Sequence, residues 1–211
     1  MKNIASFVRA CLGFFFVFIF FFGSPCLVDA SQKEAIFAGG CFWCLEHDLE
    51  DLPGVISVDS GYTGGELVSP TYRNHEGHQE AVIVYFDSEK VNYKKLLRSF
   101  WRNIDPLDNG GQFCDRGDSY RPVIFTKDDI QRNEAIQSVE DASRELDIPI
   151  RQIKLHIQDA TTFWLAEQYH QDFAKRNRLK YNFYRNSCGR DRRLDEVWGD
   201  NARTGASWSS Y

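Results

Sequence analysis

The sequence predicts an α/β (α+β) fold in which an open β-sheet is covered by helices. Short apolar or β-branched runs alternate with longer segments whose apolar residues repeat on a helical period, which gives about five strands and three helices. No internal repeat and no linker rich in proline and glycine divides the chain after residue 30. Removing the first 30 of the 211 residues leaves 181, which is enough for one domain and too few for two ordinary ones.

The first 30 residues differ from the rest and are expected to be an export signal. Lys2 and Arg9 supply a basic start, and small residues lead to a cleavage site before Ser31. Between them, residues 12–22 form an apolar run of eleven residues, whereas a membrane span needs about twenty. A cleaved signal is therefore favoured over a retained N-terminal membrane anchor. In either case we expect the folded part, residues 31–211, outside the cytoplasm and in the periplasm.

Five segments have the composition of β-strands. Residues 34–38 are mostly apolar and stop at two glycines, which indicates a buried strand that ends at a tight turn. Residues 55–58 and 81–86 are β-branched or aromatic runs bounded by turn residues, and the second is expected to be buried on both faces. Two further strands are predicted at residues 122–125 and 152–157.

Three segments have apolar residues on a helical period. The most regular is residues 93–104, whose apolar side chains form one stripe of an amphipathic helix. Residues 41–52 repeat leucine on the same period and stop at a proline–glycine pair. Residues 128–146 are predicted to be a helix with Asp128 as its N-cap. The C-terminal part is rich in aromatic and charged residues, and one helix is expected near residues 167–176.

Charge and cysteine content limit the possible functions. After residue 30 the chain keeps 23 basic and 29 acidic side chains, a net charge of −6, which argues against nucleic acid or anionic lipid as a main partner. Four of the six cysteines remain in this region: Cys41, Cys44, Cys114 and Cys188. In an exported protein four thiols would ordinarily form two structural disulfides, so a reactive role needs specific support.

Cys41 has surroundings that are typical of a reactive cysteine. It follows two glycines at the end of a predicted strand and opens a predicted helix, where backbone N–H groups and the helix dipole stabilise an anion. We therefore expect a thiolate near neutral pH, in contrast to an inert cysteine buried inside an element. Phe42 and Trp43 follow it, and although such a pair is often part of a core, beside a reactive thiol it can form an apolar pocket for a methyl group.

The segment Gly39-Gly40-Cys41-Phe42-Trp43 resembles the active-site signature of the A-type peptide methionine sulfoxide reductases. Further blocks resemble that family in the family's order: Gly61-Tyr62-Thr63-Gly64-Gly65, Pro70-Thr71-Tyr72-Arg73, Gly77-His78-Gln79-Glu80-Ala81-Val82, Asp115-Arg116-Gly117 with Tyr120-Arg121, and Glu167-Gln168-Tyr169-His170-Gln171-Asp172. The similarity covers about residues 33–199. It implies a single catalytic domain with a two-layer ferredoxin-like core, long irregular segments wrapped around that core, and no cofactor.

The resemblance also assigns roles to individual residues. It implies that Cys41 attacks the sulfur of methionine S-sulfoxide and that Glu80 protonates the sulfoxide oxygen. A sulfoxide is a poor electrophile until its oxygen is protonated, so a carboxylic acid with a raised pKa is required beside the thiol. Glu80 precedes a buried strand, where desolvation would raise its pKa. The further assignments are Phe42 and Trp43 for the substrate methyl group, and Tyr72, Tyr120 and Asp115 for the oxygen.

The product of this step is methionine and a Cys41 sulfenic acid, which another thiol must reduce. Cys188 is favoured because a glycine-flanked C-terminal segment can bring it to Cys41. Cys44 is the alternative, although its pairing would strain the first helical turn, and Cys114 is expected to pack beside the site. Here the sequence departs from the best-known members, several of which have glycine in place of Cys44 and two cysteines in a glycine-rich tail. A thioredoxin-like reductant is expected to reduce the resulting disulfide.

Three alternatives use the same residues differently. A thiol-disulfide oxidoreductase would use Cys41 and Cys44 as a redox pair, and a cysteine hydrolase would use His78 or His170 as its base. A binding domain would have all four cysteines in structural disulfides. The histidines have no spacing typical of a zinc site, so no metal is predicted. The favoured hypothesis is a monomer that repairs oxidised proteins, peptides or free methionine sulfoxide, without nucleic acid as a partner.

Overall fold

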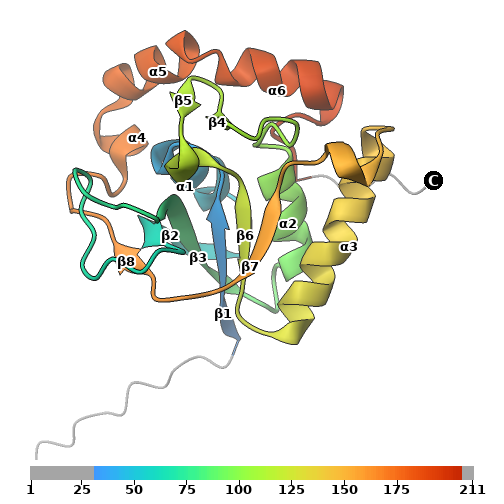
Figure 1. The fold of residues 1–211 in the computed structure, drawn as a ribbon, viewed down its shortest axis with the longest axis horizontal. Helices are drawn as coiled ribbons and strands as arrows, with labels where there is room; N and C mark the ends of the chain where they lie inside the picture. The colour runs from blue at the N-terminus through green and yellow to red at the C-terminus, as the bar shows by residue number, and fades with distance from the viewer. Residues whose placement is uncertain (1–30, 206–211) are drawn as a thin grey trace, which may run out of the picture.

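A mixed β-sheet forms the centre of the structure, a computed structural model that describes residues 31–205 (Figure 1). Its strands are β1 (Gln32–Ala38), β2 (Val55–Thr63), β3 (Gln79–Asp87), β6 (Val123–Thr126), β7 (His156–Asp159) and β8 (Trp164–Leu165). They lie in the order β7-β6-β1-β3-β2-β8, and neighbours are antiparallel except for the parallel pair of β6 and β7. A short separate hairpin consists of β4 (Gly111–Gln112) and β5 (Asp115–Arg116).

The helices are α1 (Phe42–Glu50), α2 (Tyr93–Trp101), α3 (Asp129–Glu145), α4 (Phe173–Arg176), α5 (Arg178–Ser187) and α6 (Arg190–Trp198). Three 3₁₀ turns, η1 (Asp118–Tyr120), η2 (Ile150–Gln152) and η3 (Gly199–Asn201), complete the described elements. The chain order β1-α1-β2-β3-α2-β6, with β6-β1-β3-β2 as an antiparallel sheet, is the ferredoxin-like arrangement. The expected fold class is therefore confirmed. Figure 1 shows α5 and α6 above α1 and the β4–β5 hairpin.

Alternate residues of the central strands point to opposite faces of the sheet, and both faces are covered. On β1, Phe37 packs on the helix side, and its ring lies 4.7 Å from the ring of Phe100 in α2. Ile36 points to the other face, where a smaller apolar cluster is covered by Ala160 and Phe163 rather than by a helix. The predicted burial of β3 on both faces is confirmed. The sheet thus places the end of β1, which leads to Cys41, and the start of β3, which carries Glu80.

Two predicted elements differ from the structure. Residues 150–152 form η2, and Lys154 N–H then donates to the Pro106 carbonyl at 2.8 Å, so the strand expected at residues 152–157 begins only at β7. The helix expected near residues 167–176 is reduced to α4, because Asp172 before it has a left-handed φ of 51°. In contrast, Asp128 caps α3 as predicted and accepts a hydrogen bond from Gln131 N–H at 2.8 Å.

The export signal expected at residues 1–30 lies outside the described residues. Within residues 31–205, none of the helices has the length and apolar character that crossing a membrane requires. The signal, and the alternative of an N-terminal anchor, therefore stay predictions.

Candidate active site

Cys41 is the N-cap residue of α1 and follows a turn that two glycines make possible. Gly40 has a φ of 85°, and a Cβ atom there would lie 2.7 Å from Cβ of Gln112. A Cβ atom on Gly39 would lie 2.6 Å from Cγ2 of Ile104. Larger residues would push the turn away from these neighbours. The glycines thus let the chain leave β1 and hold the Cys41 side chain, 6% exposed, at the start of the helix.

The residues that the sequence assigned to one site are brought together around a small cavity of about 50 Å³. The cavity is lined by Cys41, Phe42, Trp43, Tyr72, Glu80, Asp115, Tyr120 and Tyr184. They come from α1, β3, β5, η1, α5 and the loop before β3, so the fold collects them from distant parts of the chain. Tyr184 was not predicted, because it lies in α5, which no motif or apolar period indicated.

Glu80 is a buried carboxyl group next to the start of α1. Its Oε2 accepts a hydrogen bond from Phe42 N–H at 3.1 Å, and the residue is 2% exposed. Burial raises the pKa of Glu80 to about 8, and the negative charge of Asp115 acts in the same direction. The hydrogen bonds from Phe42 N–H and the Tyr120 hydroxyl oppose this shift but do not cancel it. Glu80 is therefore mainly protonated at neutral pH, as desolvation predicted.

Cys41 differs from the expected resting thiolate. Burial raises its pKa well above the ordinary value, and the hydrogen bond with Cys44 and the charges of Cys44 and Glu80 raise it further. The hydrogen bond with the Tyr184 hydroxyl acts in the opposite direction. The position at the N-terminus of α1 thus does not outweigh desolvation, and the expectation of a thiolate in the resting site was wrong. The thiol must lose its proton in the course of the reaction.

Trp43 is held in place from two sides. Its ring stacks on Phe173 of α4 at 3.7 Å, and its Nε1–H donates to Nδ1 of His170 at 3.0 Å. Burial lowers the pKa of His170, which keeps that nitrogen available as an acceptor. His78 binds the loop before β3, with Nδ1 accepting from Gly65 N–H at 3.2 Å. Both imidazoles are hydrogen-bonded to groups other than Cys41. The hydrolase alternative requires a histidine base directed at Cys41, so these contacts argue against it.

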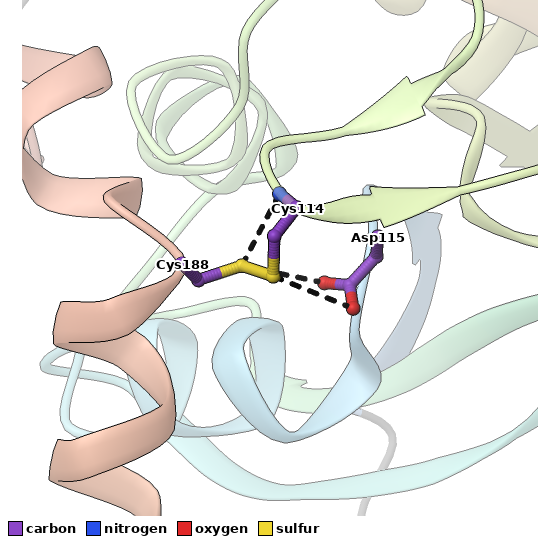
Figure 2. Close-up of side chains that lie close together, drawn as sticks. All are labelled: Cys114, Asp115 and Cys188. Carbon is purple, nitrogen blue, oxygen red and sulfur yellow. Dashed lines mark hydrogen bonds between the residues drawn. A yellow bond between two sulfur atoms is a disulfide. The ribbon is translucent and has the colours of Figure 1, made fainter.

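The four cysteines form one disulfide and leave two free thiols. Cys114 and Cys188 form a disulfide with a Cα–Cα distance of 5.0 Å, while Cys41 and Cys44 are free and buried. Cys114 lies beside the site, next to Asp115, as expected, but in a disulfide that was not predicted; Cys188 is bonded to it here, and the resolving role predicted for Cys188 stays a prediction. The two free thiols also contradict the alternative of a binding domain with every cysteine in a disulfide. Figure 2 shows the disulfide beside the carboxylate of Asp115, which also lines the cavity.

Cys114, Asp115 and Cys188 bring three potential metal ligands within 4.8 Å of one another. Metal binding by cysteine requires thiolates. The two sulfur atoms here are joined to each other in a disulfide beside the cavity (Figure 2), so in this state they are not thiolate ligands.

The model of the family described as peptide methionine sulfoxide reductase matches residues 33–202 of the chain. The chain belongs to this family. It is 51% identical over 180 residues to peptide methionine sulfoxide reductase MsrA 2 of Caulobacter vibrioides, a match that covers 83% of this chain and 90% of the relative. It is 45% identical over 177 residues to MsrA of Bacillus pumilus, with 82% of this chain and 99% of the relative covered.

Solved structures agree with the assignment. Methionine sulfoxide reductase A of Corynebacterium diphtheriae is 26% identical, has a TM-score of 0.65, and the match covers 72% of this chain and 78% of that one. Mxr1 of Saccharomyces cerevisiae in reduced form, 24% identical, has the same fold with a TM-score of 0.65 over 71% of this chain and 87% of that one. This peptide methionine sulfoxide reductase is of the A type, a peptide-methionine (S)-S-oxide reductase that uses thiols to reduce methionine sulfoxide.

Proposed function

We propose that the enzyme reduces methionine S-sulfoxide in the cavity around Cys41, with Cys41 as the nucleophile and Glu80 as the general acid. One observation carries the proposal: a buried carboxyl group, whose pKa burial raises to about 8, lines the same cavity as a buried thiol. Glu80 is bonded to the first N–H group of the helix whose N-cap is Cys41, so the acid and the thiol are fixed relative to each other. This pairing suits a reaction in which oxygen must be protonated while sulfur is attacked.

The proposed step is balanced in atoms and electrons. The sulfur of Cys41 attacks the sulfoxide sulfur while Glu80 gives its proton to the sulfoxide oxygen, and the carboxylate that remains takes the proton of the Cys41 thiol. The S–O bond to methionine breaks and the oxygen stays on Cys41. Methionine sulfur is thereby reduced by two electrons, and Cys41 is oxidised by two electrons to the sulfenic acid.

Three tyrosine hydroxyls and two rings complete the proposed site. Burial raises the pKa of Tyr72, Tyr120 and Tyr184, so each hydroxyl keeps the proton that it can donate. In our proposal Tyr72 and Tyr120 bind the sulfoxide oxygen, while Asp115 accepts a hydrogen bond from Tyr184 and holds that ring in place. The apolar partners proposed for the substrate methyl group are Phe42 and Trp43.

The cavity is small, and Tyr72 at its edge is 41% exposed. A site of this size takes the methyl sulfoxide end of one side chain and leaves the rest of the substrate outside. We therefore infer that oxidised proteins, peptides and free methionine sulfoxide are all substrates, and that the biological role is repair of proteins after oxidation.

A thioredoxin-like protein with two thiols is the proposed final reductant. Cys41 and Cys44 are 6% and 1% exposed, whereas Cys114 is exposed. Thiol-disulfide exchange requires that the attacking thiolate reach a disulfide sulfur. An external donor therefore meets the Cys114–Cys188 disulfide first, and its electrons pass inward from there.

We also propose that the mature enzyme is a periplasmic monomer that begins at Ser31. The basic start and the short apolar run of residues 12–22 support export and cleavage. An exported enzyme has no direct access to the cytosolic thioredoxin pool, so its donor is a periplasmic or membrane-relayed dithiol.

A single-turnover experiment tests the chemical step. Enzyme that retains the Cys114–Cys188 disulfide is mixed with a methionine S-sulfoxide peptide without reductant, and released methionine is counted. We expect one methionine per active site, none from Cys41→Ser, and none from the R epimer. Release by Cys41→Ser above about a tenth of the wild-type amount would reject Cys41 as the nucleophile, since the assigned mechanism has no other oxygen acceptor.

A further inference from the structure

A buried group of charges lies against the C-terminal half of α1, outside the cavity described above. Arg185 and Arg190, at the end of α5 and the start of α6, both form ion pairs with Asp48 of α1, at 2.7 and 3.6 Å. Their side chains are 9% and 1% exposed, and that of Asp48 is 8% exposed. Asp191, the second partner of Arg185, has a side chain that is 43% exposed. Two buried cations therefore share one buried anion.

Arg190 is the cation with the weaker pairing. Its Nη2 donates to the Asn103 carbonyl at 2.6 Å and its guanidinium lies 4.4 Å from the centre of the Phe113 ring, but its Nε has no hydrogen-bond partner. A buried charge without a full partner is costly. An additional anion near this guanidinium would stabilise it.

Cys44 is in a position to supply that anion. It lies four residues before Asp48, so both side chains are on the same face of α1. Nη1 of Arg190 lies 3.6 Å from the place where a Cβ atom on Gly40 would be, which puts the guanidinium beside the turn that carries Cys41. Cys44 is a free thiol, 1% exposed, and the chemical step above does not use it.

We propose that Cys44 is the thiol that resolves the Cys41 sulfenic acid, and that Arg190 is a positioning residue that favours the Cys44 thiolate. This inference rests on the proposed function, because it requires the sulfenic acid as an intermediate. It replaces Cys188 as the resolving cysteine and leaves the Cys114–Cys188 pair as the link to the external reductant.

The local backbone allows the two sulfur atoms to meet. Cys41 has φ −53° and ψ 121°, so it lies outside the helix as N-cap, and Cys44 occupies the third helical position. A side chain at the N-cap lies near that third residue, and the Cys41 sulfur does not cap the helix with a hydrogen bond of its own. The thiols of Cys41 and Cys44 are hydrogen-bonded to each other. The strain expected for this pairing therefore does not arise, since Cys41 is not part of the first helical turn.

The electrostatic surroundings of Cys44 agree with this geometry. The hydrogen bond from Cys41 lowers the pKa of Cys44, and the charges of Arg190 and Arg185 lower it further, against the opposing effects of burial and Asp48. The pKa values of the two cysteines are thus shifted in opposite directions: burial, the shared hydrogen bond and the charge of Glu80 raise that of Cys41, while the shared hydrogen bond and the two guanidinium groups lower that of Cys44.

The resolving step is balanced as follows. The Cys44 thiolate attacks the sulfur of the Cys41 sulfenic acid, an S–S bond forms, and the S–O bond breaks. The departing hydroxide takes the proton that Glu80 accepted in the previous step and leaves as water. Cys41 is reduced from sulfenic acid to disulfide while Cys44 is oxidised to the same disulfide, so no further oxidant or reductant is needed.

Trapping experiments on fully reduced enzyme test the role of Cys44. Enzyme with all four thiols reduced receives one equivalent of methionine S-sulfoxide, is quenched over time with dimedone and an alkylating agent, and is analysed by peptide mapping. The first disulfide should link Cys41 to Cys44. In Cys44→Ser the methionine burst should persist while Cys41 accumulates as the dimedone adduct. An early Cys41–Cys188 disulfide with Cys44 still alkylated, or normal loss of sulfenic acid in Cys44→Ser, would overturn the proposal.

The methionine burst distinguishes failure of the chemical step from failure of the resolving step. If the wild-type enzyme releases no methionine in this experiment, the proposed function fails before Cys44 is involved. If methionine is released at the normal rate but the wrong disulfide forms, the chemical step stands and the role of Cys44 is rejected.

Variants of Arg190 test its part in this step. Arg190→Gln should slow the loss of sulfenic acid about tenfold at neutral pH and shift the pH profile of that loss upward by about one unit, while methionine release keeps its rate. Arg190→Lys should restore most of the profile because it keeps the charge. Arg193→Gln, on the same helix with its charge paired to Asp105, is the matched control and should change neither rate.

A second measurement leaves Arg190 unchanged, so it remains valid if Arg190→Gln fails to fold. The ultraviolet absorbance of a thiolate is followed with rising pH in reduced wild-type enzyme and in Cys44→Ser. We expect the wild type to show a thiolate signal that appears at lower pH than for an ordinary cysteine and that Cys44→Ser lacks. Equal absorbance of the two proteins, or an unchanged pH profile in folded Arg190→Gln, would reject the role of Arg190.

Discussion

Glu80 performs two tasks with one carboxyl group. Its Oε2 satisfies the first N–H group of α1, which Cys41 as N-cap leaves without a side-chain partner. The same bond fixes the carboxyl group next to the thiol. A carboxyl group at a helix N-terminus would normally be ionised, but here burial and the charge of Asp115 raise the pKa of Glu80. The acid of the reaction is therefore also part of the local fold.

Glu80→Gln should separate these tasks. The amide oxygen can still accept the Phe42 N–H bond, but the transferable proton is gone. We expect the rate of methionine release in a single turnover to fall by about 10²- to 10⁴-fold, with the fold unchanged by circular dichroism. A decrease of less than about threefold would assign the acid role to another group.

The pH dependence of the chemical step follows from the same residue. The proton of Glu80 is present below a pKa of about 8 and is lost above it. Single-turnover methionine release should therefore decline as pH rises through about 8. The decline should be absent in Glu80→Gln, whose slow rate has no such proton to lose. A rate that rises steadily across this range in the wild-type enzyme would contradict the assignment.

Most residues of the candidate site could be predicted from the sequence, but some of its contacts could not. Motif positions identified Cys41, Glu80 and the rings around them, because each follows a recognisable block. Tyr184 was missed because it lies on α5, whose buried face includes Arg185 rather than a regular apolar stripe. Pairing of Cys114 with Cys188, 74 residues apart in the chain, depends on how α5 meets the β4–β5 hairpin and could not be predicted from spacing.

At the scale of elements, strong periodicity gave correct predictions and charged segments did not. Helix α2 has a clear apolar stripe and forms where it was expected. Helix α6 was not predicted, because its buried residues include Arg190 beside Leu194 and Trp198. Buried arginines weaken the apolar period that identifies a helix. Here they are stabilised by Asp48 on α1, a contact that only the folded chain provides.

The turn between β1 and α1 is the element on which the position of Cys41 depends. Gly40→Ala introduces a Cβ atom at a φ of 85° and 2.7 Å from Gln112. We expect a loss of about 1–3 kcal/mol in the free energy of unfolding, together with a large loss of activity as the turn shifts. Urea unfolding and methionine release measure the two effects.

Gly199→Ala is the matched control for this turn. Gly199 also has a positive φ, 54°, but a Cβ atom there has nothing within 4 Å. Because φ 54° with ψ −133° is a conformation that alanine rarely adopts, this variant should also lose about 1–3 kcal/mol, but it should keep its activity. Equal activity of the two variants would show that the contact with Gln112 does not position Cys41.

At the scale of the whole molecule, burial of acidic groups near α1 links stability to pH. Glu46 of α1 is 2% exposed, accepts a hydrogen bond from Asp172 N–H at 2.9 Å, and has its pKa raised to about 7, mainly by burial. Glu80 is raised to about 8 by the same cause. Both start from an ordinary value of 4.5. Between that value and the raised one, the folded state therefore binds more protons than the unfolded state.

The sign of the effect follows from linkage: stability falls with rising pH wherever the folded state holds the extra proton. These two groups should thus cost stability progressively from about pH 4.5 up to about 7 for Glu46 and about 8 for Glu80. Urea unfolding of the disulfide-intact protein near pH 5 and pH 8 tests this for wild type, Glu80→Gln and Glu46→Gln. Across this interval the wild type should lose on the order of 3 kcal/mol more than Glu80→Gln, and Glu46→Gln should also lose less than wild type. The comparison between variants cancels the contributions of His170 and the exposed carboxylates, which all three proteins share. Parallel losses in wild type and Glu80→Gln would mean that Glu80 is ionised in the folded enzyme at neutral pH and cannot supply the proton.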